Sequence, residues 1–195
     1  MTIAHQLARR AGHDRHGADA SGVPSTAAIG GHPIHPMLIP FPLAFLSATL
    51  ATDLAYRRTR DPFWAQASRW MLRAGLASGA AAGVFGALDY VTIHRAHQSA
   101  HGRVHALGNL AALTLAAANL AGRREDPEAG AQGRGLALSA AVAAILGVTG
   151  WAGGELSYRH GVGVVGPDER VPLAGPPEER PRRVAGEHPE TVAGW

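Results

Sequence analysis

Seven of the eleven histidines in this 195-residue chain lie next to the ends of long apolar segments. His32 and His35 belong to the stretch GHPIHPMLIPFP, where each precedes a proline. The other five lie before the third apolar segment, at its start, or after the fourth segment: His94, His97, His101, His105 and His160. Neutral imidazole is the side chain that most often binds transition metals. The pattern therefore suggests metal or haem ligation.

The four central histidines have helical spacing. Successive members lie three, four and four positions apart, which places them on one face of an α-helix. We therefore expect the third long helix to begin before its apolar run, near Ile93, and to carry all four imidazoles in one stripe. Asn109 lies four positions beyond the last histidine and continues this stripe into the apolar segment.

The two His-Pro pairs predict an extended leader in front of the first helix. A residue before proline is biased toward extended backbone geometry, so His32 and His35 are both expected on a stretched segment. Pro36 suits the start of a helix. Pro40 and Pro42 then disturb its first turns, which a membrane protein tolerates where protein or water satisfies the freed carbonyl groups.

Four apolar segments are expected to position these histidines. A bilayer core about 30 Å thick requires about 20 mostly apolar residues per helix. Four segments meet this requirement: about 37–56, 70–91, 104–121 and 135–154. The fourth has no charged residue and so lacks the polar stripe of a soluble bundle helix.

The predicted fold class is all-α, a four-transmembrane-helix antiparallel bundle with disordered N- and C-terminal tails. The transmembrane domain covers 31–164, between an arm at 1–30 and a tail at 165–195 that is too polar to form a core. Glycines recur every fourth position in two of the helices, a spacing that permits close helix packing in lipid. These glycines are Gly75, Gly79 and Gly83, and Gly150 and Gly154.

Arginine predicts the orientation of the bundle. All 18 basic residues are arginine; seven lie in the first and third loops and two in the second. Short loops rich in positive charge face the cytoplasm. We therefore expect a multi-pass protein of the cell membrane with both termini extracytoplasmic, and the histidine cluster near the outer face.

Carboxylates accompany the histidines. Asp89 ends the second segment and Glu155 the fourth, where both could accept hydrogen bonds from imidazole N–H groups, as carboxylates do behind metal ligands. Asp53 lies near the opposite end. Because ionisable groups at membrane depth are normally paired, we expect Asp53 to pair with Arg57 or Arg73.

These motifs also carry a family resemblance. The stretches GHPIHPMLIPFP, GVFGALDY, HGRVHALGN and GWAGGELSYRHGVGV together resemble the bacterial membrane-protein family catalogued as domain of unknown function 2231, over about residues 31–164. The resemblance implies a four-helix integral membrane protein and implies no particular activity.

The first functional hypothesis is a haem- or metal-linked redox or electron-transfer component. Haem b requires one or two axial histidines and an apolar slot. His105 is the best candidate because it lies deepest in an apolar segment, with His35 or His101 as its partner. A bare transition-metal ion requires three or more ligands. They would come from His32, His35, His97, His101, Asp89 and Glu155.

Two other hypotheses remain open. In a non-catalytic membrane scaffold or partner-binding subunit, the same residues form a structural polar cap. A proton or ion pathway requires polar residues through the whole membrane, and the middles of the third and fourth segments have few. Catalytic triads, Walker loops and dinucleotide fingerprints are absent, which leaves enzymatic activity undecided.

The composition also bears on cofactors and partners. The chain has no cysteine, which excludes disulfides and thiolate metal sites. No basic helix with interleaved aromatic residues occurs, so no nucleic-acid partner is expected. The expected partners are the lipid bilayer and, as candidates, a redox protein or a second copy of the chain.

Overall fold

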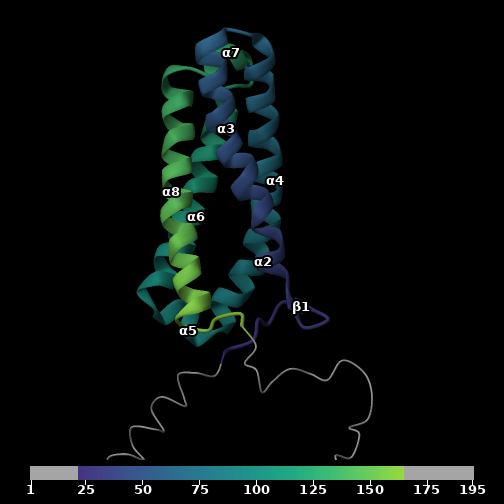
Figure 1. The fold of residues 1–195 in the computed structure, drawn as a ribbon, viewed down its shortest axis with the longest axis vertical. Helices are drawn as coiled ribbons and strands as arrows, with labels where there is room; N and C mark the ends of the chain where they lie inside the picture. The colour runs from purple at the N-terminus through teal and green to yellow at the C-terminus, as the bar shows by residue number, and fades with distance from the viewer. Residues whose placement is uncertain (1–21, 165–195) are drawn as a thin grey trace, which may run out of the picture.

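The computed structural model describes residues 22–164, which form an up-down bundle of four long helices (Figure 1). Three of these helices are preceded by a short one, and a two-stranded hairpin leads into the first. In chain order the elements are β1 (Ala28–Ile29), β2 (His32–Pro33), α2 (Ile34–Leu38), α3 (Pro40–Thr59), α4 (Pro62–Thr92), α5 (His94–Gln98), α6 (Ala100–Ala121), α7 (Pro127–Gly130) and α8 (Gly133–Tyr158). The predicted disorder of 1–21 and 165–195 concerns residues outside the described part.

The predicted fold class is confirmed. Four helices are long and apolar enough to cross a membrane: Ile34–Thr59, Pro62–Thr92, Ala100–Ala121 and Gly133–Tyr158. The first of these runs from α2 into α3 because Ile39, between them, has helical backbone angles (φ −51°, ψ −39°). The protein is therefore a multi-pass membrane protein whose helices contact a lipid bilayer.

Local capping chemistry sets the turn between the first two long helices. Arg60 ends α3 in the left-handed conformation, with φ 58°. The Asp61 carboxylate then accepts a hydrogen bond from the Phe63 N–H at 2.9 Å, and Pro62 occupies the first position of α4. The turn is short, so α3 and α4 are antiparallel neighbours.

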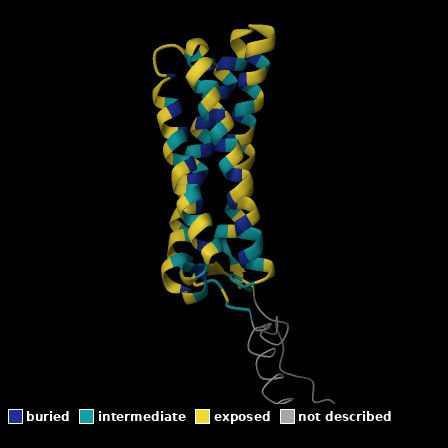
Figure 2. Ribbon diagram, turned by 90° about the vertical axis from the view of Figure 1, so that its left-hand side faces the viewer, coloured by how far each residue is buried: buried dark blue, intermediate teal, exposed yellow. Residues whose placement is uncertain are grey.

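Figure 2 shows that exposed residues cover the outer faces of the helices and that buried ones face inward. The exposed set includes many large apolar side chains and the buried set several polar ones, as expected for a bundle surrounded by lipid. Large exposed apolar side chains include Val84, Leu88, Leu107, Leu110, Val148 and Trp151. Buried polar side chains include Thr49, Asp53, Ser68, Asn119, Arg123, Ser139 and Thr149. A soluble protein normally shows the reverse arrangement, because charged groups are rarely fully buried in it.

The helices pack as two hairpins. α3 packs mainly on α4, and α6 packs mainly on α8; the hairpins then meet through contacts of α3 with α8 and of α4 with α6. In this square arrangement α3 and α6 lie diagonally across the bundle axis. The apolar core between the hairpins consists of Leu46, Leu72, Ala112, Ala116, Val142 and Leu146.

The bundle has two distinct ends. The histidine end carries α5, the start of α2 and the end of α8, and the arginine end carries α7 and the turn from α3 to α4 (Figure 1). Residues 22–30, which we assigned to the disordered arm, contact the histidine end. Val23 forms a bridge with Val162, and the Ser25 hydroxyl donates to both carboxylate oxygens of Asp89 at 2.8 and 2.7 Å.

Some of the predicted glycines lie at helix contacts and others do not. A Cβ atom at Gly75 would lie 2.5 Å from Leu46 Cδ2, and one at Gly79 would lie 2.5 Å from Leu113 Cδ2. Cβ atoms at Gly83 and Gly150 would meet nothing within 4 Å, so the expectation of close packing is wrong there. Spacing alone does not determine which face of a helix meets its neighbour.

A buried ion pair joins the two hairpins near the arginine end. Asp53 and Arg123 both have fully buried side chains. Arg123 donates from Nη1 to Asp53 Oδ1 and from Nη2 to Asp53 Oδ2, each at 2.7 Å. The pairing of Asp53 with Arg57 or Arg73 is therefore wrong. Arg57 lies one turn from Asp53 on α3 and Arg73 lies on the adjacent α4, whereas Arg123 comes from the opposite hairpin.

Polar groups from all four long helices complete this network. The hydroxyl groups of Ser68 on α4 and Ser139 on α8 both donate to the Asp53 carboxylate. Arg123 Nε donates to the Asn119 side-chain oxygen at 3.0 Å. Bidentate pairing and extra hydrogen bonds are the conditions under which a buried ion pair is tolerated.

Substituting Asp53→Ala is expected to lower the free energy of unfolding by about 3–5 kcal/mol, because Arg123 is left buried without a counter-ion. The double substitution Asp53→Leu/Arg123→Met removes both charges and should cost much less. Unfolding of the detergent-purified protein by sodium dodecyl sulfate measures both. The exposed Glu125→Ala is the control, and equal effects of D53A and E125A would contradict a stabilising role for the pair.

Candidate functional site

Two histidine side chains lie close together at the histidine end. His35 comes from α2 and His105 from α6, which lies diagonally across the bundle axis. Their ring centroids are 6.0 Å apart, and the ring planes are nearly perpendicular, at 88°. Both side chains are partly buried. Of the two haem-ligand partners that we considered for His105, the structure brings His35 within reach.

Each imidazole is held by the neighbouring helix in the same way. His35 Nδ1 lies 2.8 Å from the Ala82 carbonyl oxygen on α4, and His105 Nδ1 lies 2.8 Å from the Thr149 carbonyl oxygen on α8. A carbonyl oxygen can only accept, so Nδ1 is the donor in both rings. In the neutral ring, the free lone pair is then on Nε2, the nitrogen available to a metal.

Glycines provide the space for both rings. Gly86 and Gly153 each lie one helical turn after the carbonyl group that binds the ring. A Cβ atom at Gly86 would lie 2.7 Å from Cε1 and Nδ1 of His35. At Gly153 it would lie 2.9 Å from the same atoms of His105. Each imidazole therefore lies against bare helix backbone, a close approach that only glycine allows.

The histidine pair and the buried ion pair occupy matching positions in the two hairpins. Asp53 follows His35 by 18 residues, and Arg123 follows His105 by 18. In a continuous helix, eighteen residues make about five turns, or about 27 Å, and return to the same face. Asp53 lies on α3, whereas Arg123 lies two residues beyond the end of α6. The bundle axis thus carries two polar layers, each built from equivalent positions. The equal spacing is visible in the sequence and is a signal that could have paired Asp53 with Arg123.

The backbone at His35 differs from the prediction. His32 is extended in β2, as expected, and its side chain is exposed. His35, however, belongs to helix α2, so the extended leader is wrong at that position. Pro36 lies in the first turn, where a backbone N–H has no helical partner, and the helix therefore begins before it.

The single histidine stripe is also wrong. Ser99 has extended backbone angles (φ −76°, ψ 149°) and separates α5 from α6, and its hydroxyl accepts from the Gly102 N–H at 2.9 Å. A serine cap thus ends the continuous helix that the spacing predicted. The His94 and His97 rings pair on α5, with centroids 4.9 Å apart.

His101 lies apart from the central pair, although we considered it as a ligand. It is on α6, one turn before His105. Its ring centroid is 5.4 Å from that of Trp151 and 5.5 Å from that of His160. Six histidines at this end therefore form three pairs, and the seventh, His32, is exposed.

The carboxylates of Asp89 and Glu155 bind other groups and not the histidine rings. Asp89 accepts hydrogen bonds from the Ser25 hydroxyl and from the Thr26 backbone N–H at 3.0 Å. Glu155 forms an ion pair with Arg159 at 3.0 Å. Within residues 22–164, no group of three or more histidine, aspartate or glutamate side chains could hold a metal ion. The proposed metal ligands, His32, His35, His97, His101, Asp89 and Glu155, therefore do not share one centre in the described structure.

Comparison with known proteins identifies the family. A family model described as a predicted membrane protein (DUF2231) matches residues 31–166, which include all four long helices. The chain belongs to this family, as the motifs at the histidine end and along the helices indicated. No curated protein and no solved structure gives a significant match.

Two matched glycine substitutions test the support of the imidazoles. Gly86→Ala places a methyl group against the His35 ring and should lower the free energy of unfolding by about 1–3 kcal/mol, as overpacking does. Gly83→Ala adds the same methyl group where nothing lies within 4 Å and should change stability little. Unfolding by sodium dodecyl sulfate measures the stability of both variants. Equal losses of stability in G86A and G83A would contradict the close packing of His35 on Gly86.

Proposed function

We propose that His35 and His105 bind one transition-metal centre, haem b iron in the first place, and that the protein is a redox or electron-transfer component of the cell membrane. The ring separation carries this proposal. Two imidazoles that ligate one metal from opposite sides, with metal–nitrogen distances of about 2.0–2.1 Å, have centroids roughly 6.3 Å apart. The observed separation is 6.0 Å.

The hydrogen bonds at Nδ1 support the same function. Metal-binding histidines usually donate their second ring N–H to a carbonyl or carboxylate group, which fixes the ring and raises the basicity of the ligating nitrogen. The Ala82 and Thr149 carbonyl groups provide this support for His35 and His105. These two hydrogen bonds would fix the orientation of the rings and leave Nε2 of each as the ligating nitrogen.

The number of available ligands favours haem over a bare ion. A bare zinc, copper or iron ion in a protein is usually held by three or more side chains, and the described residues contain no such group. Haem iron would need only one or two ligands from the protein, here His35 and His105, because the porphyrin supplies the other nitrogen ligands. Bound haem would provide one-electron transfer, while the two histidines hold it near one membrane surface.

A second candidate function is the structural polar cap. The same two hydrogen bonds link α2 to α4 and α6 to α8, so they also stabilise the bundle without a metal. The partner of such a scaffold would be a redox protein or a second copy of the chain. The two functions differ in whether the purified protein contains a cofactor.

An absorption spectrum of the detergent-purified protein tests the haem site. Protein from cells supplied with a haem precursor and transition metals should have a Soret band that shifts on reduction. His35→Ala and His105→Ala should each reduce bound haem at least tenfold, whereas His32→Ala, at an exposed residue of the same end, should retain it. A colourless and metal-free wild-type protein would contradict the proposal and favour the polar cap.

The proposed orientation has both termini outside the cytoplasm. The chain has no cysteine, so single cysteines report their own accessibility. Gln98→Cys at the histidine end should react with a membrane-impermeant maleimide in intact spheroplasts, and Glu125→Cys at the arginine end should react only after lysis. The reverse pattern would place the histidine pair at the cytoplasmic face.

A further inference from the structure

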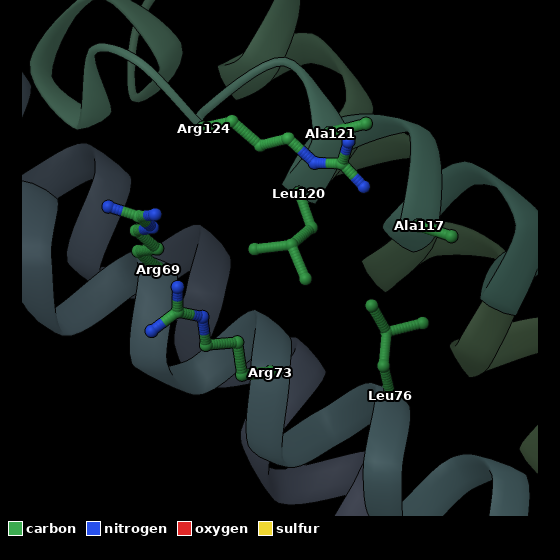
Figure 3. A pocket seen from close by; sticks show the side chains of 7 residues that line it. All are labelled: Arg69, Arg73, Leu76, Ala117, Leu120, Ala121 and Arg124. Carbon is green, nitrogen blue, oxygen red and sulfur yellow. The ribbon is translucent and has the colours of Figure 1, made fainter.

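A cavity of about 250 Å³ opens at the arginine end between α4 and α6. Three arginines line it: Arg69 and Arg73 from α4, and Arg124 just beyond α6 (Figure 3). The rest of the lining is aliphatic and includes Leu76 and Leu120. This cavity is at the opposite end of the bundle from the histidine pair and is independent of the function proposed for that pair.

The charges around the cavity are unbalanced. No carboxylate contributes to its lining. Asp53, the buried acid at this end, already accepts two hydrogen bonds from Arg123, which does not line the cavity. The Arg69 Nε atom is buried and has no hydrogen-bond partner within the described structure. Because a buried polar group without a partner is costly, this nitrogen indicates that a ligand acceptor belongs beside it.

The other two lining arginines, Arg73 and Arg124, lie at the mouth of the cavity. Both are exposed, and the Arg73 guanidinium lies over the Trp70 ring, 4.8 Å from its centroid. Trp70 is itself 60% exposed on the outer surface of α4. Tryptophan on the lipid-facing surface typically marks the depth of the headgroups. The three cations are therefore expected at the level where lipid phosphates lie.

The aliphatic part of the lining continues toward the middle of the membrane. Leu76 lies two turns further along α4 than Arg69, and Ala117 lies two turns before Arg124 along the α6 direction. A ligand that fills the cavity therefore meets cations at one side and hydrocarbon at the other. A free anion would satisfy only the first of these surfaces.

We propose that this cavity binds the phosphate headgroup of an anionic phospholipid, with the acyl chain against Leu76 and Ala117. Arginine suits a phosphate because its planar group donates two parallel hydrogen bonds. Basic pockets between transmembrane helices are suited to such headgroups. The bound lipid would join α4 to α6, one of the two contacts between the hairpins.

Native mass spectrometry of the full chain in detergent tests the site. The probes are phosphatidylglycerol, phosphatidylcholine of the same acyl chains, and inorganic phosphate. One phosphatidylglycerol molecule should bind at least ten times more tightly than phosphatidylcholine, because only the former carries net negative charge. Equal affinity for the two lipids would overturn the proposal. Displacement of phosphatidylglycerol by inorganic phosphate at the same concentration would also overturn it, because the site would then recognise a free anion.

Substitutions separate the cavity from general surface charge. Arg69→Gln/Arg73→Gln/Arg124→Gln should weaken phosphatidylglycerol binding at least tenfold. The double variant Arg73→Gln/Arg124→Gln changes only exposed residues, retains the fold and should weaken binding at least threefold. The control Arg57→Gln/Arg58→Gln/Arg134→Gln removes three exposed charges from the same end and should bind as the wild type does. Equal losses in the double variant and the control would overturn the proposal.

Discussion

The bidentate ion pair between Asp53 and Arg123 constrains the rest of this structure. In a bilayer neither charge has water to solvate it, so each requires the other and the hydroxyl groups around them. The pair joins helices that lie diagonally across the bundle, and the serines that bind Asp53 come from the remaining two helices. Two parallel hydrogen bonds form in one geometry only, which fixes the axial position of the two hairpins relative to each other.

The position of the histidine pair follows from that constraint. Since His35 and His105 precede the charged residues by the same 18 positions, aligning the ion pair also aligns the imidazoles about five turns away. Each hairpin then repeats one local arrangement, in which an imidazole donates to a backbone carbonyl and lies on a glycine. Equivalent positions in the two hairpins thus create a stabilising layer at one end and a candidate metal site at the other.

The two ends of the bundle present different chemistry to the two membrane surfaces. At the histidine end, residues 22–30 contact the bundle through Asp89 and Val162. The same end holds the imidazoles of His35 and His105, whose Nε2 lone pairs are available. The arginine end holds guanidinium groups around a partly aliphatic cavity. The proposed metal centre near one surface and the proposed lipid site at the other are compatible with one bundle, because the core between the two ends is packed with apolar side chains.

The sequence alone determined the four spans, the family and the end at which the histidines gather, because hydrophobic length and residue content are properties of each segment by itself. It also gave His105 as the best haem-ligand candidate but left His35 and His101 open as its partner. Only the tertiary structure decided the partners. Asp53 binds Arg123 rather than Arg57 or Arg73, Asp89 binds the N-terminal segment rather than a histidine, and Ser99 divides the expected stripe. These outcomes depend on which helix faces meet across the bundle, and periodicity within one helix carries no information about the angle at which another helix packs against it.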